Sequence, residues 1–427
     1  MVKAFIFNTN KCVGCNACAA ACRLYNGWDV SPRNIYSYNE ELYPDLPVIN
    51  LSLACNHCEN PACLEGCPAK AISLKGNTRS VIIDEEKCLG CRYCQWNCPF
   101  DAPKFNNKKR IVEKCNLCIN NNPDNPSCAT ACPTGALSWN YSDEADIKNL
   151  PAWIPSTKLK PALSVSEFKS DAVKISPAGK FTGKSTTVSK KTINNEWSLL
   201  VFSFASMLAV TIMSACFIRG DSPEKVILSL IAIAGISSLF HLGKPFRAWR
   251  AVSNPLKSKL SREIYMFIVF SILSASAFIF RKPEFSLAAT LAGLIFLIAI
   301  DSVYTGTDKK VFFHSGQTFL SALLLISYSS HNTWAFGFMV AVKVILSLRY
   351  FKSPDNKVLR FLRVSVTLIV WTGLVTGLTE MSRVLTLIII FAELLDRIIF
   401  YIDFEPVNIK DHIHRYIKAL RYEKKRG

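Results

Sequence analysis

A cysteine motif that occurs four times is the strongest constraint on how this chain can fold. Two copies have the spacing C-x2-C-x2-C-x3-C, and two wider copies keep the three-residue gap before the last cysteine. The four groups are Cys12, Cys15, Cys18 and Cys22; Cys55, Cys58, Cys63 and Cys67; Cys88, Cys91, Cys94 and Cys98; and Cys115, Cys118, Cys128 and Cys132. This internal repetition predicts a repeated supersecondary unit, with loop insertions in the second and fourth copies.

The spacing is typical of iron–sulfur ligands. Three thiolates two residues apart on a tight loop can point into one small volume, and the fourth cysteine begins a helical turn that points away. In ferredoxins with two clusters, this fourth cysteine ligates the other cluster. A structural zinc site needs four ligands that close one tetrahedron, which leaves no use for the third and fourth cysteines of these groups. We therefore predict four [4Fe–4S] clusters, with zinc as the alternative.

The N-terminal sequence MVKAFIFNTNKCVGC indicates where the cysteines are first exposed. It has no charged stretch followed by an apolar stretch and a small-residue cleavage site, so we expect this part to begin in the cytoplasm. Thiols stay reduced there, which favours metal ligation over disulfides. Short apolar runs at 81–84 and 136–139 predict small strands of an α+β ferredoxin-like domain. His57 lies among cysteines that already complete the ligand count, so we expect a hydrogen-bond donor or a surface residue.

Apolar segments dominate the second half of the chain. Most of the eight that we identify approach the ~20 residues that a helix needs to cross the hydrocarbon core of a bilayer. They span residues 197–218, 226–243, 263–280, 286–304, 317–330, 334–350, 364–380 and 384–402. These segments leave almost no polar helix faces, so the sequence predicts an all-α polytopic membrane bundle of about eight helices. The net charge of +18 does not indicate a nucleic-acid partner, because the basic residues lie between apolar spans.

The distribution of basic residues predicts the orientation of this bundle. The segment before the first span, the loops after the second, fourth and sixth spans, and the C-terminal tail hold most of its Lys and Arg residues. Loops rich in these residues stay in the cytoplasm. We therefore expect a multi-pass protein of the bacterial cytoplasmic membrane, with its iron–sulfur domain on the cytoplasmic side.

Six ionisable residues are predicted to lie at membrane depth. They are Asp301, Lys343, Glu380, Glu393, Asp396 and Arg397. Charge in lipid is costly, so these side chains are expected to face the bundle interior and to pair with one another. Glu393 and Arg397 are one helical turn apart, and their mutual neutralisation is favoured over a role in proton transfer.

His241 and Glu263 form the candidate quinol site. His241 closes the second span and Glu263 opens the third, on the side expected for the clusters. A histidine and a carboxylate suit a quinol, whose oxidation releases protons as well as electrons; a helix-capping histidine and an interfacial glutamate are the alternative. No haem is expected, because no histidine lies in the middle of a span.

The sequence thus predicts three parts. Residues 1–160 form the four-cluster domain, residues 161–196 a flexible linker, and residues 197–427 the eight-helix anchor with a basic tail. The linker is rich in Ser, Thr, Lys, Gly and Pro, and its first stretch, LKPALSV, is expected to lie along the cluster domain.

Two regions resemble subunits of the dimethyl sulfoxide reductase family. Residues 1–160 are similar to its four-cluster electron-transfer subunit through CLGCRYCQWNCPFDAPKFN, KCNLC and CPTGAL. Residues 197–427 are similar to its membrane anchor through HLGKPFRAWRAVSN, LSREI and AELLDRIIFY. The resemblance implies that two usually separate subunits are fused here.

The resemblance also implies an exchange of ligands between groups. The implied ligand sets are Cys12, Cys15, Cys18 and Cys132; Cys22, Cys115, Cys118 and Cys128; Cys55, Cys58, Cys63 and Cys98; and Cys67, Cys88, Cys91 and Cys94. It further implies a haem-free anchor with a menaquinol site near the clusters, consistent with His241 and Glu263. Relatives often face the periplasm, whereas the loop charges here favour the cytoplasm.

Together these patterns predict the electron-transfer and anchor subunit of a respiratory molybdopterin oxidoreductase. Menaquinol from the membrane quinone pool would be oxidised in the bundle, and four clusters would carry electrons to a separate catalytic subunit. That subunit would reduce a terminal acceptor such as dimethyl sulfoxide. The alternatives are reverse flow from a dehydrogenase to quinone, as in formate dehydrogenase- or polysulfide reductase-like complexes, and a membrane-tethered redox sensor.

Overall fold

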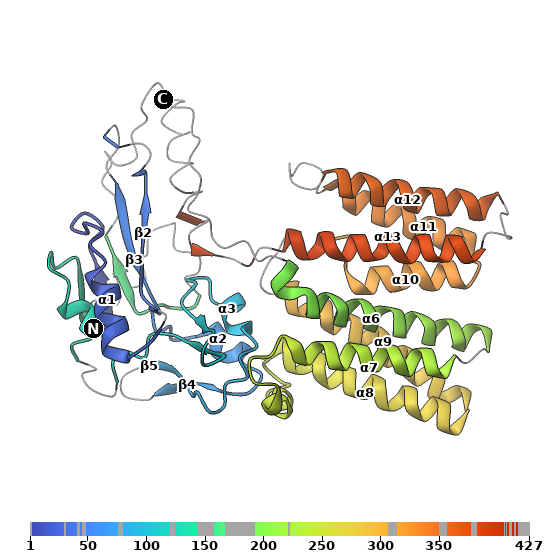
Figure 1. Cartoon of the computed structure of the whole chain (residues 1–427), viewed down its shortest axis with the longest axis horizontal. Helices are drawn as coiled ribbons and strands as arrows, with labels where there is room; N and C mark the ends of the chain where they lie inside the picture. The colour runs from blue at the N-terminus through green and yellow to red at the C-terminus, as the bar shows by residue number, and fades with distance from the viewer. Residues whose placement is uncertain are drawn as a thin grey trace. The chain divides into compact units, whose positions relative to one another are not determined.

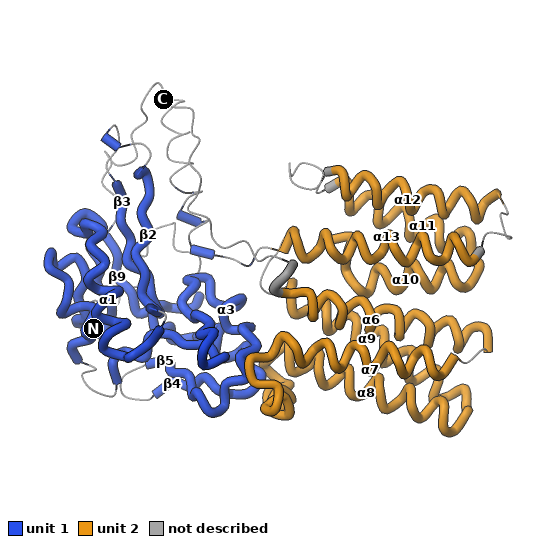
Figure 2. Tube along the Cα trace, in the orientation of Figure 1, with its two compact units in different colours: residues 1–188, 406–427 blue, residues 189–405 orange. Residues whose placement is uncertain are grey.

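The computed structural model separates the chain into two compact units (Figure 2). Unit 1 comprises Met1–Val188 with Pro406–Gly427, and unit 2 comprises Ser189–Glu405. The structure describes residues 2–29, 31–40, 43–44, 48–75, 80–119, 124–142, 158–166, 193–220, 223–305, 314–349, 357–376, 382–404, 406, 408, 409, 412, 413 and 416.

Unit 1 is a small α+β domain built from short strands and helices. Its three-stranded sheet has β1 (Val2–Phe7) between antiparallel β8 (Leu137–Ser142) and parallel β9 (Leu163–Val165). The other strands form antiparallel pairs: β2 (Asn34–Tyr38) with β3 (Ile49–Leu53), β4 (Ile72–Lys75) with β5 (Ser80–Ile83), and β6 (Lys104–Asn106) with β7 (Ile111–Glu113). Strands β5 and β8 confirm the strands predicted at 81–84 and 136–139.

Each cysteine group ends in a short helix. These helices are α1 (Ala17–Asn26), α2 (Ala62–Gly66), α3 (Tyr93–Asn97) and α4 (Ser127–Thr130). The third cysteine of each group lies inside its helix, and the fourth lies inside or just after it, as the spacing predicts. The motif therefore encodes a loop followed by a helical turn.

The start of the predicted linker belongs to unit 1. Strand β9 runs beside β1, where Phe5 pairs with Leu163, and the Phe5 N–H donates to the Ala162 carbonyl at 3.0 Å. The stretch LKPALSV thus lies along the cluster domain as predicted, but the flexible linker does not begin at 161. The physical reason is that Leu163 is apolar and buried, so this stretch gains a core contact as well as backbone hydrogen bonds. Residues 167–192 lie outside the described residues.

The C-terminal end also belongs to unit 1 rather than to the anchor region with which the sequence groups it. Ile409 and Ile413 are fully buried in the hydrophobic cluster that contains Phe5, Leu51 and Phe100. A strongly basic tail is expected to be solvated. Its two isoleucine side chains are nevertheless buried, because they make apolar contacts in this cluster.

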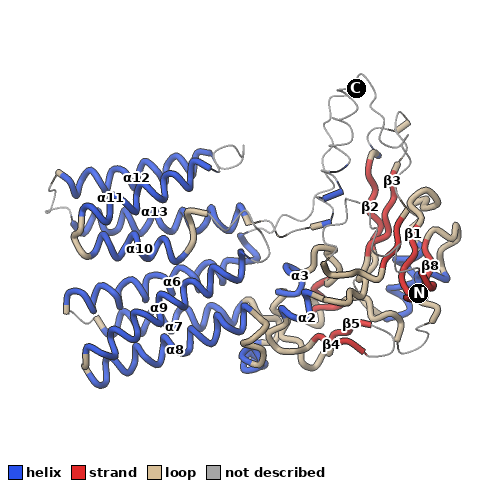
Figure 3. Tube along the Cα trace, turned by 180° about the vertical axis from the view of Figure 1, so that it is seen from behind, coloured by secondary structure: helices blue, strands red, loops and turns tan. Residues whose placement is uncertain are grey.

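Unit 2 is helical (Figures 1 and 3). Within the described residues its eight α-helices are α6 (Ile193–Arg219), α7 (Glu224–Phe240), α8 (Lys259–Phe280), α9 (Pro283–Thr305), α10 (Thr318–Ser329), α11 (Thr333–Arg349), α12 (Lys357–Val375) and α13 (Ser382–Asp403). A 3₁₀ helix, η4 (Pro245–Val252), follows α7. Each predicted span overlaps one of these α-helices.

Fewer than eight of these helices have the length and composition of a membrane span. In the described part of the chain, α6, α8, α9 and α12 are long and apolar enough, and the count reaches five if α7 and η4, bent by 107°, form one span. Helices α10 and α11 are shorter apolar segments. The predicted count of eight spans is therefore not confirmed.

The outer faces of these helices are apolar. Ile279, Leu291, Phe338 and Leu387 are all exposed, although a soluble bundle would present polar groups there. Charged side chains lie instead in the interior, as predicted for the ionisable residues that the structure describes; Glu380 lies outside the described residues. The distribution is that of helices surrounded by lipid.

Lys343 on α11 is the centre of the buried charge network. Its ammonium forms an ion pair with Glu393 and lies 3.2 Å from the Asp396 carboxylate. Arg363 on α12 lies 2.9 Å from Asp396, and Arg397 lies 3.6 Å from Asp301. The expected mutual pairing of Glu393 and Arg397 is therefore wrong. Neighbouring helices supply closer partners, so proximity along α13 does not decide the pairing.

Lys343→Met tests the energetic role of this network. The substitution leaves Glu393 and Asp396 with one cation fewer in a buried site, and should destabilise the fold by about 3–5 kcal/mol. Thermal unfolding of the purified protein in detergent measures this effect. Lys225→Met is the control, because Lys225 is exposed. Equal unfolding temperatures for the two variants would contradict a stabilising role for Lys343.

Candidate iron–sulfur centres and anchor site

Thiols from different cysteine groups lie close together in unit 1. Cys12 interacts electrostatically with Cys15 and Cys18 of its own group, but also with Cys132 of the fourth group. Cys22 interacts instead with Cys118 and Cys128. The first and fourth groups are therefore combined in space, with their last cysteines exchanged.

The second and third groups are combined in the same way. Cys58 interacts with Cys55, Cys63 and Cys98, so the last cysteine of the third group lies among the first three of the second. Cys94 interacts with Cys91, Cys88 and Cys67, which is the reciprocal exchange.

These four sets of thiols form a series. Cys18 of the first set interacts with Cys128 of the second, Cys115 of the second with Cys55 of the third, and Cys63 of the third with Cys94 of the fourth. These cysteines are free thiols in the structure. Among the described residues, no three His, Cys, Asp or Glu side chains are arranged to hold a single metal ion.

The space between the thiols of the fourth set fits a bound group. A pocket there is lined by Cys67, Cys88, Cys91 and Cys94. Apolar side chains, Ile72, Ile83, Leu89 and Val112, line the rest of it. An apolar shell of this kind limits the access of water to an iron–sulfur centre and so affects its potential.

Burial keeps several of these thiols protonated while they lack a metal. It raises the pKa of Cys22 to about 12 and the pKa of Cys98 to about 11. Burial acts in the same direction on Cys132, but the hydrogen bond from the Leu137 N–H and those from Thr134 and Ala136 outweigh it and lower the pKa of that thiol. Metals bind the thiolate, so cluster binding must release protons at the buried sites.

Two buried cations point to negative charge at these sites. The Lys114 ammonium is 3.5 Å from the Cys55 sulfur, and the Arg33 guanidinium interacts electrostatically with Cys128, Cys115, Cys18 and Cys22. Within the described residues, neither side chain forms an ion pair with a carboxylate. A buried charge needs a partner, and a cluster with four thiolate ligands is anionic. The donor set therefore fits iron–sulfur clusters.

His57 donates a hydrogen bond to a cysteine, which is one of the two roles that the sequence predicts for it. The Val81 N–H donates to its Nδ1 at 3.1 Å, so Nε2 carries the proton and donates to the Cys115 sulfur at 3.4 Å. Burial, together with the charges of Lys114 and Arg33, lowers the pKa of His57 well below its ordinary value. The imidazole is therefore neutral and has one fixed tautomer.

In unit 2, Glu263 lies in a buried polar cluster. It is near the start of α8, is only 6% exposed, and interacts electrostatically with Arg397 and Asp301. Tyr304 and Tyr401 also interact with it, and their hydroxyls are 2.8 Å apart. The sequence did not single out either tyrosine, since their positions in apolar helices resemble those of packing residues.

Arg397 joins this cluster to three other helices. Its Nε donates to the Ser203 hydroxyl of α6 at 3.0 Å, and its Nη1 donates to the Gly316 carbonyl before α10. Asp301 on α9 accepts the N–H groups of Thr318 and Phe319 at the start of α10, each at 3.0 Å. The buried charges near Glu263 are therefore held by hydrogen bonds as well as by ion pairing.

His241 has a different environment. It is half-buried at the end of α7, and its Nδ1 is 2.5 Å from the Ser238 carbonyl, which fixes that nitrogen as the donor. In the neutral imidazole, Nε2 then lacks the proton.

Comparison with known proteins identifies both regions. Residues 47–141 match the family model of the 4Fe-4S dicluster domain, and residues 221–370 match that of the DMSO reductase anchor subunit (DmsC). The B component of the anaerobic dimethyl sulfoxide reductase of Haemophilus influenzae is 34% identical over 39% of this chain and 89% of the relative. The corresponding component of the Escherichia coli enzyme is 36% identical over 33% and 74%, respectively. The B component of the sulfite dehydrogenase of Allochromatium vinosum is 31% identical over 31% and 66%.

The fold, the cysteine sites and these matches define an iron–sulfur electron-transfer protein joined to a membrane anchor. The chain is a member of the family of dimethyl sulfoxide reductase electron-transfer subunits, and carries the anchor domain of the same enzyme family in the same polypeptide. Its anchor domain and apolar helices make it a multi-pass membrane protein.

His57→Leu should lower the midpoint potential of a cluster with Cys115 as a ligand, because a hydrogen bond to sulfur stabilises the more negative, reduced state. The expected shift is about 60 mV, the one-electron equivalent of about 1.4 kcal/mol and close to the value of a hydrogen bond to a charged group. A redox titration followed by electron paramagnetic resonance measures it. His331→Leu in unit 2 is the control; unchanged potentials in His57→Leu would contradict the assignment.

Proposed function

We propose that this chain oxidises menaquinol in its anchor and passes the electrons through four [4Fe–4S] clusters to a separate molybdopterin-containing catalytic subunit. That subunit would reduce a terminal acceptor such as dimethyl sulfoxide. When bound, the clusters supply one-electron redox centres whose potentials depend on ligation and surroundings. Residues of this chain would ligate the clusters, arrange them in series and accept the protons of the quinol.

The observation that carries this proposal is the serial arrangement of thiols. We assign the clusters to Cys12, Cys15, Cys18 and Cys132; to Cys22, Cys115, Cys118 and Cys128; to Cys55, Cys58, Cys63 and Cys98; and to Cys67, Cys88, Cys91 and Cys94. Because the thiol interactions described above link each set to the next, electrons would pass along them in that order. The first set contains the exposed Cys15, which favours this end for exchange with the catalytic subunit.

Quinol oxidation needs groups that accept protons, and Glu263 is the best placed candidate. Its carboxylate is buried near a cation, Arg397, and near hydroxyl groups that can exchange protons. His241, whose Nδ1 lies beside the Ser238 carbonyl, is the candidate to receive the second hydroxyl proton of the quinol. General acid–base catalysis needs such groups within hydrogen-bond reach of the substrate hydroxyls.

The direction of electron flow has a second candidate. The sulfite dehydrogenase component that this chain resembles bears the name of an oxidising enzyme, so reverse flow from a dehydrogenase partner to quinone is the alternative. The basic loops support a location in the bacterial cytoplasmic membrane with the clusters on the cytoplasmic side.

Cysteine-to-serine variants test the ligand exchange. Cys98→Ser should perturb the same cluster as Cys58→Ser, although Cys98 belongs to the motif of Cys91. The two variants should therefore change the same features of the electron paramagnetic resonance spectrum, whereas Cys91→Ser should change others. A Cys98→Ser spectrum that matches Cys91→Ser would contradict the exchange.

Glu263→Gln tests the quinol site. Loss of the proton acceptor should slow the reduction of the clusters by a menaquinol analogue by about 100-fold or more, with reduction by dithionite unchanged. Stopped-flow absorbance of the purified chain measures both rates. Glu284→Gln is the control because Glu284 is exposed at the start of α9. Equal quinol rates in the two variants would remove Glu263 from the site.

A further inference from the structure

The chain returns to unit 1 after its last anchor helix. Helix α13 ends at Asp403, and Ile409 and Ile413 are the next fully buried apolar residues. Tyr416 packs against the same cluster. The three positions have the i, i+4, i+7 spacing of one face of a helix. The surrounding tail is basic, so this stripe is its only apolar feature in the described residues from 406 onwards.

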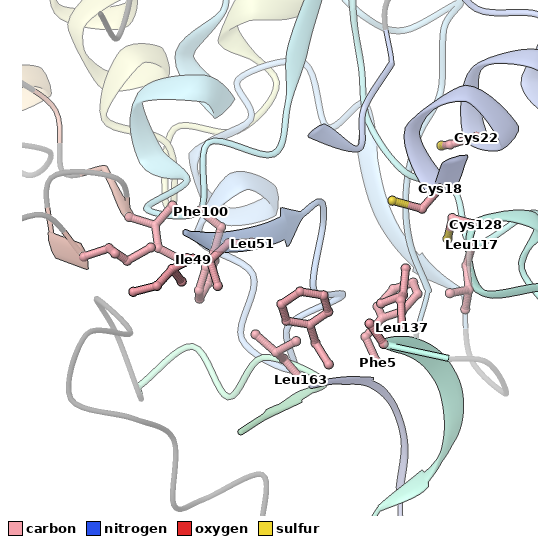
Figure 4. Close-up of a cluster of buried hydrophobic side chains, with 14 residues drawn as sticks. Phe5, Cys18, Cys22, Ile49, Leu51, Phe100, Leu117, Cys128, Leu137 and Leu163 are labelled. Carbon is pink, nitrogen blue, oxygen red and sulfur yellow. The ribbon is translucent and has the colours of Figure 1, made fainter. Parts of the chain in front are cut away.

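The stripe forms part of the hydrophobic core of unit 1. Its neighbours in the hydrophobic cluster include Ile49, Leu51 and Phe100. Figure 4 shows Ile49, Leu51 and Phe100 gathered beside the faint red ribbon of the C-terminal segment. A basic helix with an apolar stripe could otherwise lie on a membrane surface. Here the apolar side chains are buried in protein, which excludes that use for them.

A backbone contact links the segment to a cluster-binding loop. The Ile409 N–H donates to the Pro99 carbonyl at 2.7 Å. Pro99 directly follows Cys98, whose thiol lies with those of the second cysteine group, and Phe100 follows Pro99 in the same core. The C-terminal segment therefore restrains the turn that directs Cys98 away from its own group.

The other end of the segment is fixed in unit 2. Asp403 accepts a hydrogen bond from Arg360, and its carboxylate is 3.1 Å from the Nε2 of His314. Phe404 is buried, with its ring 5.2 Å from that of Tyr304. Only four residues of sequence separate Phe404 in unit 2 from Ile409 in unit 1. A short connection between two fixed ends gives a high effective concentration for docking.

We propose that the segment from Phe404 to Tyr416 is a docking element by which the anchor retains the iron–sulfur unit, independently of the linker that joins them after β9. The partner of the apolar surface formed by Ile49, Leu51 and Phe100 is thus the apolar stripe of Ile409, Ile413 and Tyr416 at the C-terminus of an anchor domain. This inference does not rest on the identity of the quinol, the acceptor or the direction of electron flow.

Cutting the linker tests the proposal on the full chain. A protease recognition sequence is inserted between Lys180 and Phe181, and the chain is expressed alone, isolated in membranes and cleaved. The N-terminal fragment should stay with the membranes after cleavage. In the double variant Ile409→Asp, Ile413→Asp, most of it should move to the soluble fraction after cleavage, and none before. Leu74→Asp is the matched control, because Leu74 is exposed on unit 1, and its fragment should stay bound.

A competition experiment covers the case in which the double variant fails to fold. A synthetic peptide with the sequence of residues 404–427 is added to cleaved membranes of the unaltered chain. The peptide should release the N-terminal fragment with its iron–sulfur absorbance, and a peptide of scrambled sequence should not. Release of the fragment from the unaltered chain by cleavage alone, or its retention in the presence of the peptide, would overturn the proposal.

Discussion

The exchange of the fourth cysteine between motifs is the constraint on which unit 1 depends. No cysteine group places its four thiols together by itself, because Cys22 and Cys98 are carried away by the helical turn that follows the first three cysteines. The first group must therefore meet the fourth, and the second must meet the third, before four thiols converge. This requirement brings β1 and β8, from opposite ends of the domain sequence, into one sheet. It also explains why Arg33 and Lys114 are buried without carboxylate partners among the described residues, since the thiolate sites supply the negative charge.

The anchor depends on a different balance of charge. Lys343, Arg363 and Arg397 reach carboxylates from neighbouring helices, so α9, α11, α12 and α13 are connected through side chains that lipid could not solvate. Such pairs contribute modest stability when complete, but an unpaired member is costly. They therefore specify which helices are neighbours. Arg397 and Asp301 also interact electrostatically with Glu263, so one of the pairs that connect the helices also affects the electrostatic environment of the proposed quinol site.

Local patterns predicted much of this architecture. The cysteine spacing predicted a helical turn at the end of each group, and the apolar segments overlap the eight α-helices that the structure describes in unit 2. The hydrogen bond from His57 was one of two stated expectations, because a complete cysteine set leaves histidine only a supporting role. These features depend on residues within a few positions of one another, so a periodic sequence pattern is enough to predict them.

Features that depend on partners far along the chain were not predictable in the same way. The pairing of Glu393 with Lys343 rather than Arg397 is decided by where α11 lies. The roles of Tyr304 and Tyr401 beside Glu263 depend on three helices meeting. The burial of Ile409 and Ile413 depends on a hydrophobic cluster that includes residues more than 300 positions earlier. In each case the local sequence shows whether a side chain is polar or apolar, but tertiary packing decides which residue it contacts.

The central claim is that the anchor delivers quinol electrons to four clusters in one chain. The most direct test is anaerobic reduction of the purified full-length protein in lipid nanodiscs with excess menaquinol analogue, followed by iron analysis and spin quantification. The account predicts about sixteen iron atoms per chain, four for each cluster, and quinol-dependent reduction of those clusters whose potentials the quinol can reach. About eight iron atoms after anaerobic reconstitution, or clusters that dithionite reduces and quinol does not, would contradict it.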